Sequence, residues 1–144
     1  SGEDEKFTSG KELVKIEIQG FRIFLYICYD LRFPEIFRKV AGQTDLYIVI
    51  ENWQKDRIDA WDTLLKARAI ENLSFVAGVN RVGNAGAKNF ISHNGHSSLY
   101  NPSGKNLFEF CEDERILYGE ISLDDLKSFR EKFPFLNDRR KEFQ

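Results

Sequence analysis

A long apolar run that ends in a cysteine constrains this chain more than any other stretch. Residues 21–27 are Ile, Phe, Leu and Tyr with a single arginine, and Cys28 follows directly. Such density is typical of a buried strand covered on both faces. The sequence then becomes charged and reaches Pro34, which suits the first position of a helix because its missing N–H costs nothing there. We predict a strand, a corner at Cys28 and a following helix.

The position of Cys28 allows two interpretations. At a strand-to-helix corner a thiol can face a cleft, and the next backbone N–H groups can stabilise a developing negative charge. Free cysteine is also among the most buried residue types, where it behaves as a small hydrophobic side chain. The spacing alone leaves both interpretations open.

Length and charge limit the class of protein. The 144 residues predict one domain over residues 1–144 with room for a core. The net charge is −2, from 21 basic and 23 acidic residues, so the composition has no excess of positive charge that would predict binding to nucleic acid or an anionic membrane. No apolar run approaches the ~20 residues of a membrane span, and the opening residues do not resemble a signal peptide.

The two cysteines, Cys28 and Cys111, are too few and too far apart to suggest a disulfide framework. That usage favours a reducing compartment, in which Cys28 remains a thiol. We therefore expect a cytoplasmic protein.

The remaining chain reads as alternating strands and helices, which predicts an α/β layered fold. A half-buried strand precedes Gln19-Gly20 and predicts a hairpin with the Cys28 strand. Apolar runs predict strands at Asp45–Ile50, Ser74–Asn80 and Arg115–Ile121. Helices are predicted from Pro34 to Gly42, at Asp56–Asn72 with Asp56 as its cap, and at Leu123–Phe133 with a Ser122 cap that involves Asp125. Turn residues predict a loop at Gly83–Gly95 and a hairpin of Ser97–Tyr100 with Leu107–Phe110.

The segment Ile27–Glu35 resembles the nucleophile motif of the nitrilase superfamily, the carbon-nitrogen hydrolases that cleave amides and nitriles through a cysteine thioester. Further matches follow in the order and spacing of the branch that includes the omega-amidases. They are Asn52-Trp53, Arg57, Trp61, Leu65, residues 67–72, residues 78–83 and Gly95-His96-Ser97.

This resemblance implies a four-layer αββα sandwich, of which the chain looks like the C-terminal half, because the nitrilase fold is about twice as long. Glu3 matches the segment that follows the family's catalytic lysine. We therefore expect the domain to be truncated on its N-terminal side.

Carried over by resemblance, the catalytic residues are Cys28 as nucleophile and Glu3 as a second active-site glutamate that orients substrate and lysine. The backbone N–H of Tyr29 corresponds to an oxyanion donor. The family's general-base glutamate and its lysine fall in the missing half, and an unactivated thiol, with a pKa of about 8.5, needs such a base. The implied reaction is hydrolysis of a small linear amide with release of ammonia and no cofactor, by a protein that is inactive as the isolated fragment.

The three residues after the predicted strand Asp45–Ile50 are candidates for the substrate wall: Glu51, Asn52 and Trp53. Glu51 departs from the branch, which usually has a small residue there. We hypothesise that its carboxylate lies in or beside the pocket and disfavours acidic substrates. Arg68 and Glu71 are expected to form ion pairs between the helices and the cysteine corner.

Other functions stay open. A cysteine–histidine pair would require His93 or His96 beside Cys28, and no ordinary zinc spacing is present. A truncated, catalytically silent relative would serve as an interaction or dimerisation module. An acyltransferase would use the same thioester with an amine in place of water. Because a half-sandwich exposes a sheet face, we expect a homo-oligomer, with a small amide as the other partner.

Overall fold

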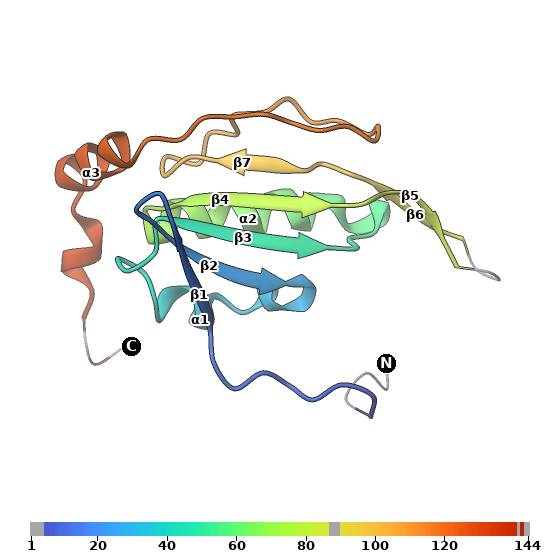
Figure 1. The fold of residues 1–144 in the computed structure, drawn as a ribbon, viewed down its shortest axis with the longest axis horizontal. Helices are drawn as coiled ribbons and strands as arrows, with labels where there is room; N and C mark the ends of the chain where they lie inside the picture. Colours follow the sequence, from blue (N-terminus) through green and yellow to red (C-terminus); the bar gives the residue numbers. More distant parts are fainter. Residues whose placement is uncertain (1–4, 87–89, 141, 143–144) are drawn as a thin grey trace.

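The computed structural model describes residues 5–86, 90–140 and 142. Its centre is a five-stranded sheet in the order β1-β2-β3-β4-β7 (Figure 1). The strands are β1 (Val14–Ile18), β2 (Phe21–Ile27), β3 (Leu46–Glu51), β4 (Phe75–Asn80) and β7 (Ser98–Tyr100). The three central strands are parallel, and the two outer strands are antiparallel to their neighbours.

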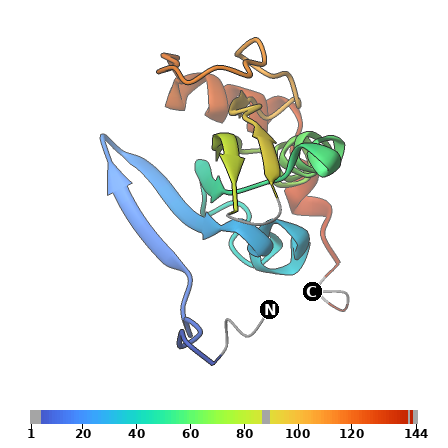
Figure 2. The same ribbon diagram turned by 90° about the vertical axis from the view of Figure 1, so that its right-hand side faces the viewer.

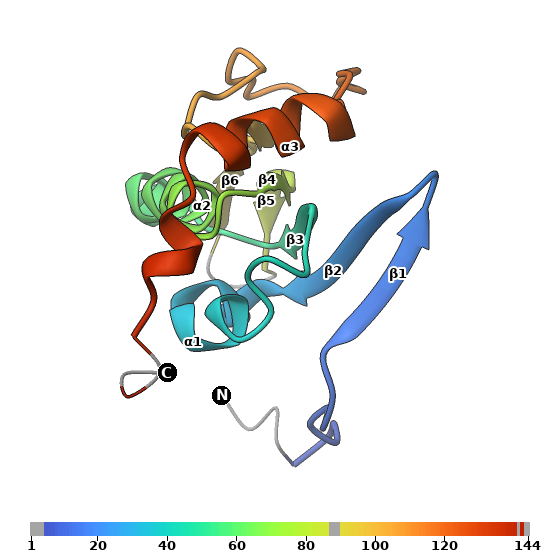
Figure 3. The same cartoon turned by 90° about the vertical axis from the view of Figure 1, so that its left-hand side faces the viewer.

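The β1–β2 hairpin forms as predicted. Ile18 pairs with Phe21, so Gln19 and Gly20 make a two-residue turn. Both turn residues have positive φ, 49° and 83°, which is the conformation that matches the right-handed twist of the flanking strands. Figures 2 and 3 show this hairpin projecting away from the other strands.

Helices cover one face of the sheet. The short helix α1 (Pro34–Arg38) and the long helix α2 (Ile58–Asn72) are the crossovers that return the chain to parallel strands, and Figure 3 shows both on the same side of the sheet. Alternate strand residues face them and form the larger core with Phe37, Trp61 and Leu65. Those strand residues are Phe24, Tyr26, Tyr47, Val49, Val76 and Tyr100.

The opposite face is covered at one end only. Ile23, Leu46, Phe75 and Leu99 pack there with Leu126 of α3 (Leu123–Lys132). Towards the other end of the strands, Ile27, Ile50 and Val79 are adjacent in register and 63%, 49% and 51% exposed. We call these three residues the open apolar face.

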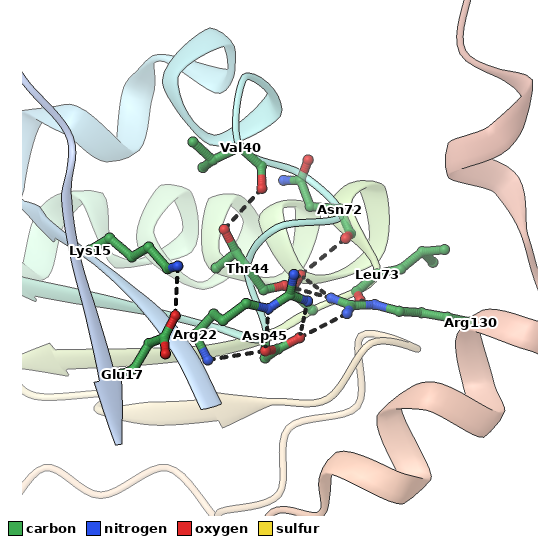
Figure 4. A network of polar contacts seen from close by, with 10 residues as sticks. Lys15, Glu17, Arg22, Val40, Thr44, Asp45, Asn72, Leu73 and Arg130 are labelled. Carbon is green, nitrogen blue, oxygen red and sulfur yellow. Dashed lines mark hydrogen bonds and ion pairs between the residues drawn. The ribbon is translucent and has the colours of Figure 1, made fainter. Parts of the chain in front are cut away.

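Polar contacts fasten the starts of the strands (Figure 4). Arg22 donates hydrogen bonds from Nε to Asp45 Oδ2 at 2.9 Å and from Nη2 to Asp45 Oδ1 at 2.8 Å. Arg130 of α3 donates to the same carboxylate at 2.9 Å and to the carbonyl of Leu73 at 2.8 Å. Burial acts to raise the pKa of Asp45, but these hydrogen bonds outweigh it and hold the pKa below its usual value.

Several predicted elements need correction. The region Gly83–Gly95 contains most of the paired strands β5 (Val82–Ala85) and β6 (Ile91–Asn94), so a plain loop was wrong. Helix α2 starts at Ile58 after the 3-10 turn η2 (Lys55–Arg57), and its N-cap is Arg57, not Asp56. The cap of α3 is as predicted, because Ser122 Oγ accepts from the Asp125 N–H at 3.2 Å.

The strand predicted to pair with β7, Leu107–Phe110, and the final predicted strand, Arg115–Ile121, are both wrong. The turn after Asn101 does fold the chain back, and the Leu107 N–H donates to the Leu99 carbonyl at 2.7 Å. Pairing ends there, with one further bridge between Tyr100 and Asn106. Residues 115–121 are all described and include no strand, and Ile116 and Tyr118 are 77% and 86% exposed. Of the apolar side chains in this segment, Ile121 packs against the core cluster that contains Leu126. The 3-10 turn η3 (Phe135–Asp138) follows α3.

Within the described residues, no helix is both long enough and apolar enough to cross a membrane.

Candidate active site

The candidate site lies where three parallel strands end together. Ile27 of β2 pairs with Ile50 of β3, and Glu51 pairs with Asn80 of β4. The carboxyl ends of these strands therefore meet at one edge of the sheet, opposite the polar contacts of Asp45. In open α/β sheets that edge is where ligands bind.

Cys28 is the first residue after β2 and is exposed. It begins the 3-10 helix η1 (Cys28–Arg32), which leads to Pro34 at the start of α1. Its φ of 54° is uncommon for a residue other than glycine and turns the chain sharply out of the strand. The predicted strand, corner and helix are thus present, and Cys28 is not a buried hydrophobic side chain.

Two contacts hold this corner from within. Asp30 Oδ2 accepts from the backbone N–H of Ile27 at 2.9 Å, which closes the turn around Cys28. Arg68 of α2 is buried and donates through Nη2 to the carbonyl of Leu31 at 2.7 Å. Its Nη1 also lies 3.0 Å from Glu71 Oε1, but both residues belong to α2, so this ion pair lies within one helix. The expected ion pair between helix and corner was therefore wrong, and the hydrogen bond from Arg68 to the Leu31 carbonyl makes the connection instead.

A cleft of about 370 Å³ opens beside Cys28. Its lining comes from the last residues of the three strands and those that follow: Ile27, Cys28, Ile50, Glu51, Asn52, Val79, Asn80 and Arg81. A second cavity of about 470 Å³ shares Asn52, Val79, Asn80 and Arg81 and extends to Cys111 and Arg115. Small-ligand sites have volumes of this order.

Asn80 fixes the backbone behind this cleft. Its side-chain oxygen accepts from the Trp53 N–H at 2.7 Å, and its amide donates to the carbonyls of Trp53 and Gly95 at 3.1 and 2.7 Å. Three segments are joined by one buried side chain. The strand ends that carry Glu51 and Arg81 are therefore held rigidly.

The charged lining residues differ in their surroundings. Glu51 is half-buried, and its Oε2 is buried with no hydrogen-bond partner among the described residues. Burying a carboxylate oxygen without a hydrogen-bond partner costs free energy. Arg81 is exposed.

The structure brings together some of the predicted site residues. Cys28, Glu51 and Asn52 line one cleft, and Tyr29 follows Cys28 within η1. Trp53 is buried, packs against Trp61 and donates from Nε1 to the Arg57 carbonyl at 2.6 Å, so its ring serves the core. Glu3 lies outside the described residues, and its role stays a prediction.

The two histidines have other partners. His96 Nδ1 lies 2.8 Å from Asp62 Oδ2, and the His96 ring stacks on Phe110 with 4.4 Å between ring centroids. Burial raises the pKa of Asp62, although the hydrogen bond with His96 opposes the rise. His93 is buried in β6. Among the described residues, no three His, Cys, Asp or Glu side chains are grouped to hold a metal ion.

Sequence reasoning missed Arg81 as a site residue. The available signal was its position, because Arg81 directly follows the last residue of a predicted parallel strand, just as Asn52 does. The same argument that selected Asn52 also applies to Arg81.

Comparison with known proteins identifies the family of the chain. Residues 2–131 match the sequence model of a family described as carbon-nitrogen hydrolase. Among curated relatives, an omega-amidase of Yersinia enterocolitica is 37% identical over 98% of this chain and 54% of its own length. A 2-oxoglutaramate amidase of Paenarthrobacter nicotinovorans is 37% identical over 96% of this chain and 48% of its own length. The chain spans about half the length of the curated relatives it matches.

Solved structures of carbon-nitrogen hydrolases have a similar fold. A CN-hydrolase superfamily protein from Xanthomonas campestris has a TM-score of 0.89 at 38% identity, over 96% of this chain and 54% of that one. A mutant amidase from Nesterenkonia sp. AN1 has a TM-score of 0.79 at 26% identity, over 99% of this chain and 51% of that one. Its active-site cysteine carries the acetamide moiety of fluoroacetamide. The α/β fold class of the nitrilase type, predicted from the sequence, is confirmed.

Proposed function

Because the chain belongs to the carbon-nitrogen hydrolase family, we propose that it supplies the nucleophile Cys28 for hydrolysis of a small linear amide. The observation that carries the proposal is the exposed Cys28 at a strand-to-helix corner, facing a cleft at the carboxyl ends of parallel strands. The covalently modified cysteine of the Nesterenkonia amidase supports the nucleophilic role proposed for Cys28.

The proposed reaction has two steps. The Cys28 sulfur, its proton removed by a base, attacks the amide carbonyl carbon, and the carbon-nitrogen bond breaks as that proton passes to the leaving ammonia. Water then attacks the thioester, releasing a carboxylic acid and restoring the thiol. The Tyr29 N–H, next along the chain, is the proposed donor to the oxyanion of each tetrahedral intermediate.

The activity belongs to the complete protein. The family's general-base glutamate and its lysine match no position in residues 1–144, and the chain spans half the length of its curated relatives. We expect residues 1–144 alone to bind the amide substrate weakly and to hydrolyse none of it.

Mass spectrometry of an acyl adduct tests the proposal. The protein, expressed from its complete gene, is incubated with a panel of linear amides, quenched in acid and digested. We expect an acyl mass on the peptide that contains Cys28. The matched variants are Cys28→Ala, which abolishes turnover, and Cys111→Ala, which retains it. Full turnover by Cys28→Ala overturns the proposal.

The alternative is a catalytically silent module for self-association. The observation that favours it is the open apolar face of Ile27, Ile50 and Val79, which is unusual on a monomer surface. The two functions differ in one measurement: a silent module forms oligomers and yields no acyl adduct on Cys28 with any amide of the panel.

A further inference from the structure

The outer side of β1 is an edge of the sheet with which no strand of the described chain pairs. β1 stands first in the strand order and pairs with β2 alone. Ile16 is half-buried and the other four residues of β1 are exposed. Such an edge is a template for pairing with another chain, and folds commonly protect it with a proline or a bulge. β1 contains no proline, and its register with β2 has no bulge.

The ladder between β1 and β2 decides which backbone groups face outwards. A two-residue turn joins Ile18 to Phe21, so this pair is hydrogen-bonded, and so is every second pair along the ladder. The N–H and C=O groups of Lys15 and Glu17 therefore point away from β2. Arg22, which lies opposite Glu17, agrees with this alternation, because its own N–H and C=O both bond with the residue that precedes β3.

The two faces of β1 differ in chemistry. Lys15 and Glu17 lie on the face that the helices cover, and 2.7 Å separates Lys15 Nζ from Glu17 Oε1. Val14, Ile16 and Ile18 alternate with them and lie on the opposite face. Val14 and Ile18 are both 54% exposed. The strand thus has a charged face with one charge of each sign and an apolar face that is partly open.

We propose that β1 pairs antiparallel with β1 of a second copy of this chain, about a twofold axis at Ile16. Lys15 of each copy then lies opposite Glu17 of the other, and their outward N–H and C=O groups bond with each other. On the apolar face Val14 lies opposite Ile18 of the other copy, which buries exposed apolar surface. This pairing joins the two sheets edge to edge and leaves the open apolar face and the cleft of Cys28 untouched. Figures 2 and 3 show the β1–β2 hairpin projecting away from the other strands, where a second hairpin can approach it.

Charge selects both this register and this partner. Sliding one copy by two residues places Glu17 opposite Glu17, and sliding it the other way places Lys15 opposite Lys15. Like charges directly opposite each other destabilise a strand pair. The proposed register alone puts opposite charges at both positions, which makes the edge complementary to itself. Because exposed ion pairs contribute little affinity, these charges determine the register, and the backbone hydrogen bonds and apolar contacts hold the dimer.

Charge reversal tests the pairing in the protein expressed from its complete gene. We expect Lys15→Glu and Glu17→Lys each to raise the dimer dissociation constant about tenfold or more, because each places like charges opposite one another twice in a symmetric dimer. Sedimentation velocity over a range of concentrations measures the constant. The double variant Lys15→Glu/Glu17→Lys restores the wild-type value. An equimolar mixture of the two single variants forms a heterodimer, because their charges are complementary at both positions.

Lys105→Glu and Glu109→Lys are the matched controls. Both residues are exposed and follow β7, at the opposite edge of the sheet, so neither change alters the constant. A wild-type protein that is monomeric at every concentration overturns the proposal. So does a constant that neither single variant raises, or a loss of dimer that the double variant does not restore. None of these outcomes bears on hydrolysis at Cys28.

Cysteine cross-linking tests the register without changing a charge. The native cysteines are first replaced by alanine, and oxidised glutathione serves as the oxidant. We expect Ile16→Cys to form a covalent dimer on a denaturing gel, because Ile16 faces its own copy across the axis. Val14→Cys alone stays monomeric, and mixed with Ile18→Cys it cross-links. An Ile16→Cys protein that forms no covalent dimer overturns the register.

Discussion

Arg130 Nη1 lies 2.9 Å from Asp45 Oδ1, which fastens α3 to the start of a strand 85 positions earlier in the chain. The same carboxylate is held from its other side by Arg22. Asp45 is 3% exposed, so its charge depends on these two partners. These ion pairs stabilise the amino-terminal ends of the strands, whereas the cleft lies at their carboxyl-terminal ends.

Removal of Arg130 tests the strength of this lock. Arg130→Ala deletes donors to Asp45 and to the carbonyls of Thr44 and Leu73. We expect the free energy of unfolding to fall by about 3 kcal/mol, since buried acceptors of charged donors lose their partners. Urea denaturation measures the change.

Lys127→Ala is the control in the same helix, because among the residues that the structure describes Lys127 pairs with the exposed Asp124 alone. An exposed pair contributes little, so stability stays within about 0.5 kcal/mol of the wild type. Equal losses for the two variants would show that Arg130 is no more important than a surface charge.

Asp45 makes stability depend on acid pH. Its pKa in the folded protein is below its usual value, so the unfolded chain binds the proton more tightly. The contribution of Asp45 is therefore complete above the unfolded pKa of about 3.9 and is lost as the pH falls through the lower folded value. We expect Asp45→Asn to be less stable than wild type at pH 7, with the difference shrinking towards pH 2.

Denaturation curves at several pH values measure that difference. Asp124→Asn, an exposed carboxylate on α3, is expected to follow the wild type throughout. A difference between wild type and Asp45→Asn that stays constant from pH 7 to pH 2 would contradict the assignment.

Gly78 allows α2 to approach the sheet. A Cβ on this residue would overlap Leu65 and lie 2.8 Å from Trp61 Cζ2. We expect Gly78→Val to lower the free energy of unfolding by about 2–3 kcal/mol, because overpacking forces the buried helix away from β4. Gly10→Ala is the control, since a Cβ there meets nothing within 4 Å. A Gly78→Val protein as stable as Gly10→Ala would disprove this packing.

The open apolar face predicts self-association of residues 1–144 studied alone. We expect light scattering to report a dimer or a larger species, or the chain to be insoluble. Ile50→Lys places a charge in the centre of the face and reduces association. Ile116→Lys serves as control, because Ile116 is 77% exposed and lies outside the face. A well-behaved monomer would count against the half-domain interpretation.

The sequence predicts the Cys28 corner well because its signals are local. An apolar run marks β2, Pro34 marks the start of α1, and Gln19-Gly20 marks the preceding turn. The family resemblance, carried by motifs over most of the chain, is confirmed by the comparisons.

Features that depend on tertiary contacts were missed or misplaced. Glycine and asparagine in residues 83–95 indicate a loop, yet β5 and β6 pair across it. The sequence predicts a strand at residues 115–121, but these residues do not pair with the edge strand β7. The Asp45–Arg130 contact joins residues too distant in sequence for any local pattern to reveal.

The backbone of Cys28 carries a cost that a glycine would not. A left-handed φ at a non-glycine residue disfavours folding by roughly 1–2 kcal/mol. Selection for thermal robustness alone would therefore replace the thiol with a hydrogen atom at this position. A lineage that keeps sulfur here gives up stability for reactivity, whereas one that has lost its chemistry is free to drift towards the more relaxed residue.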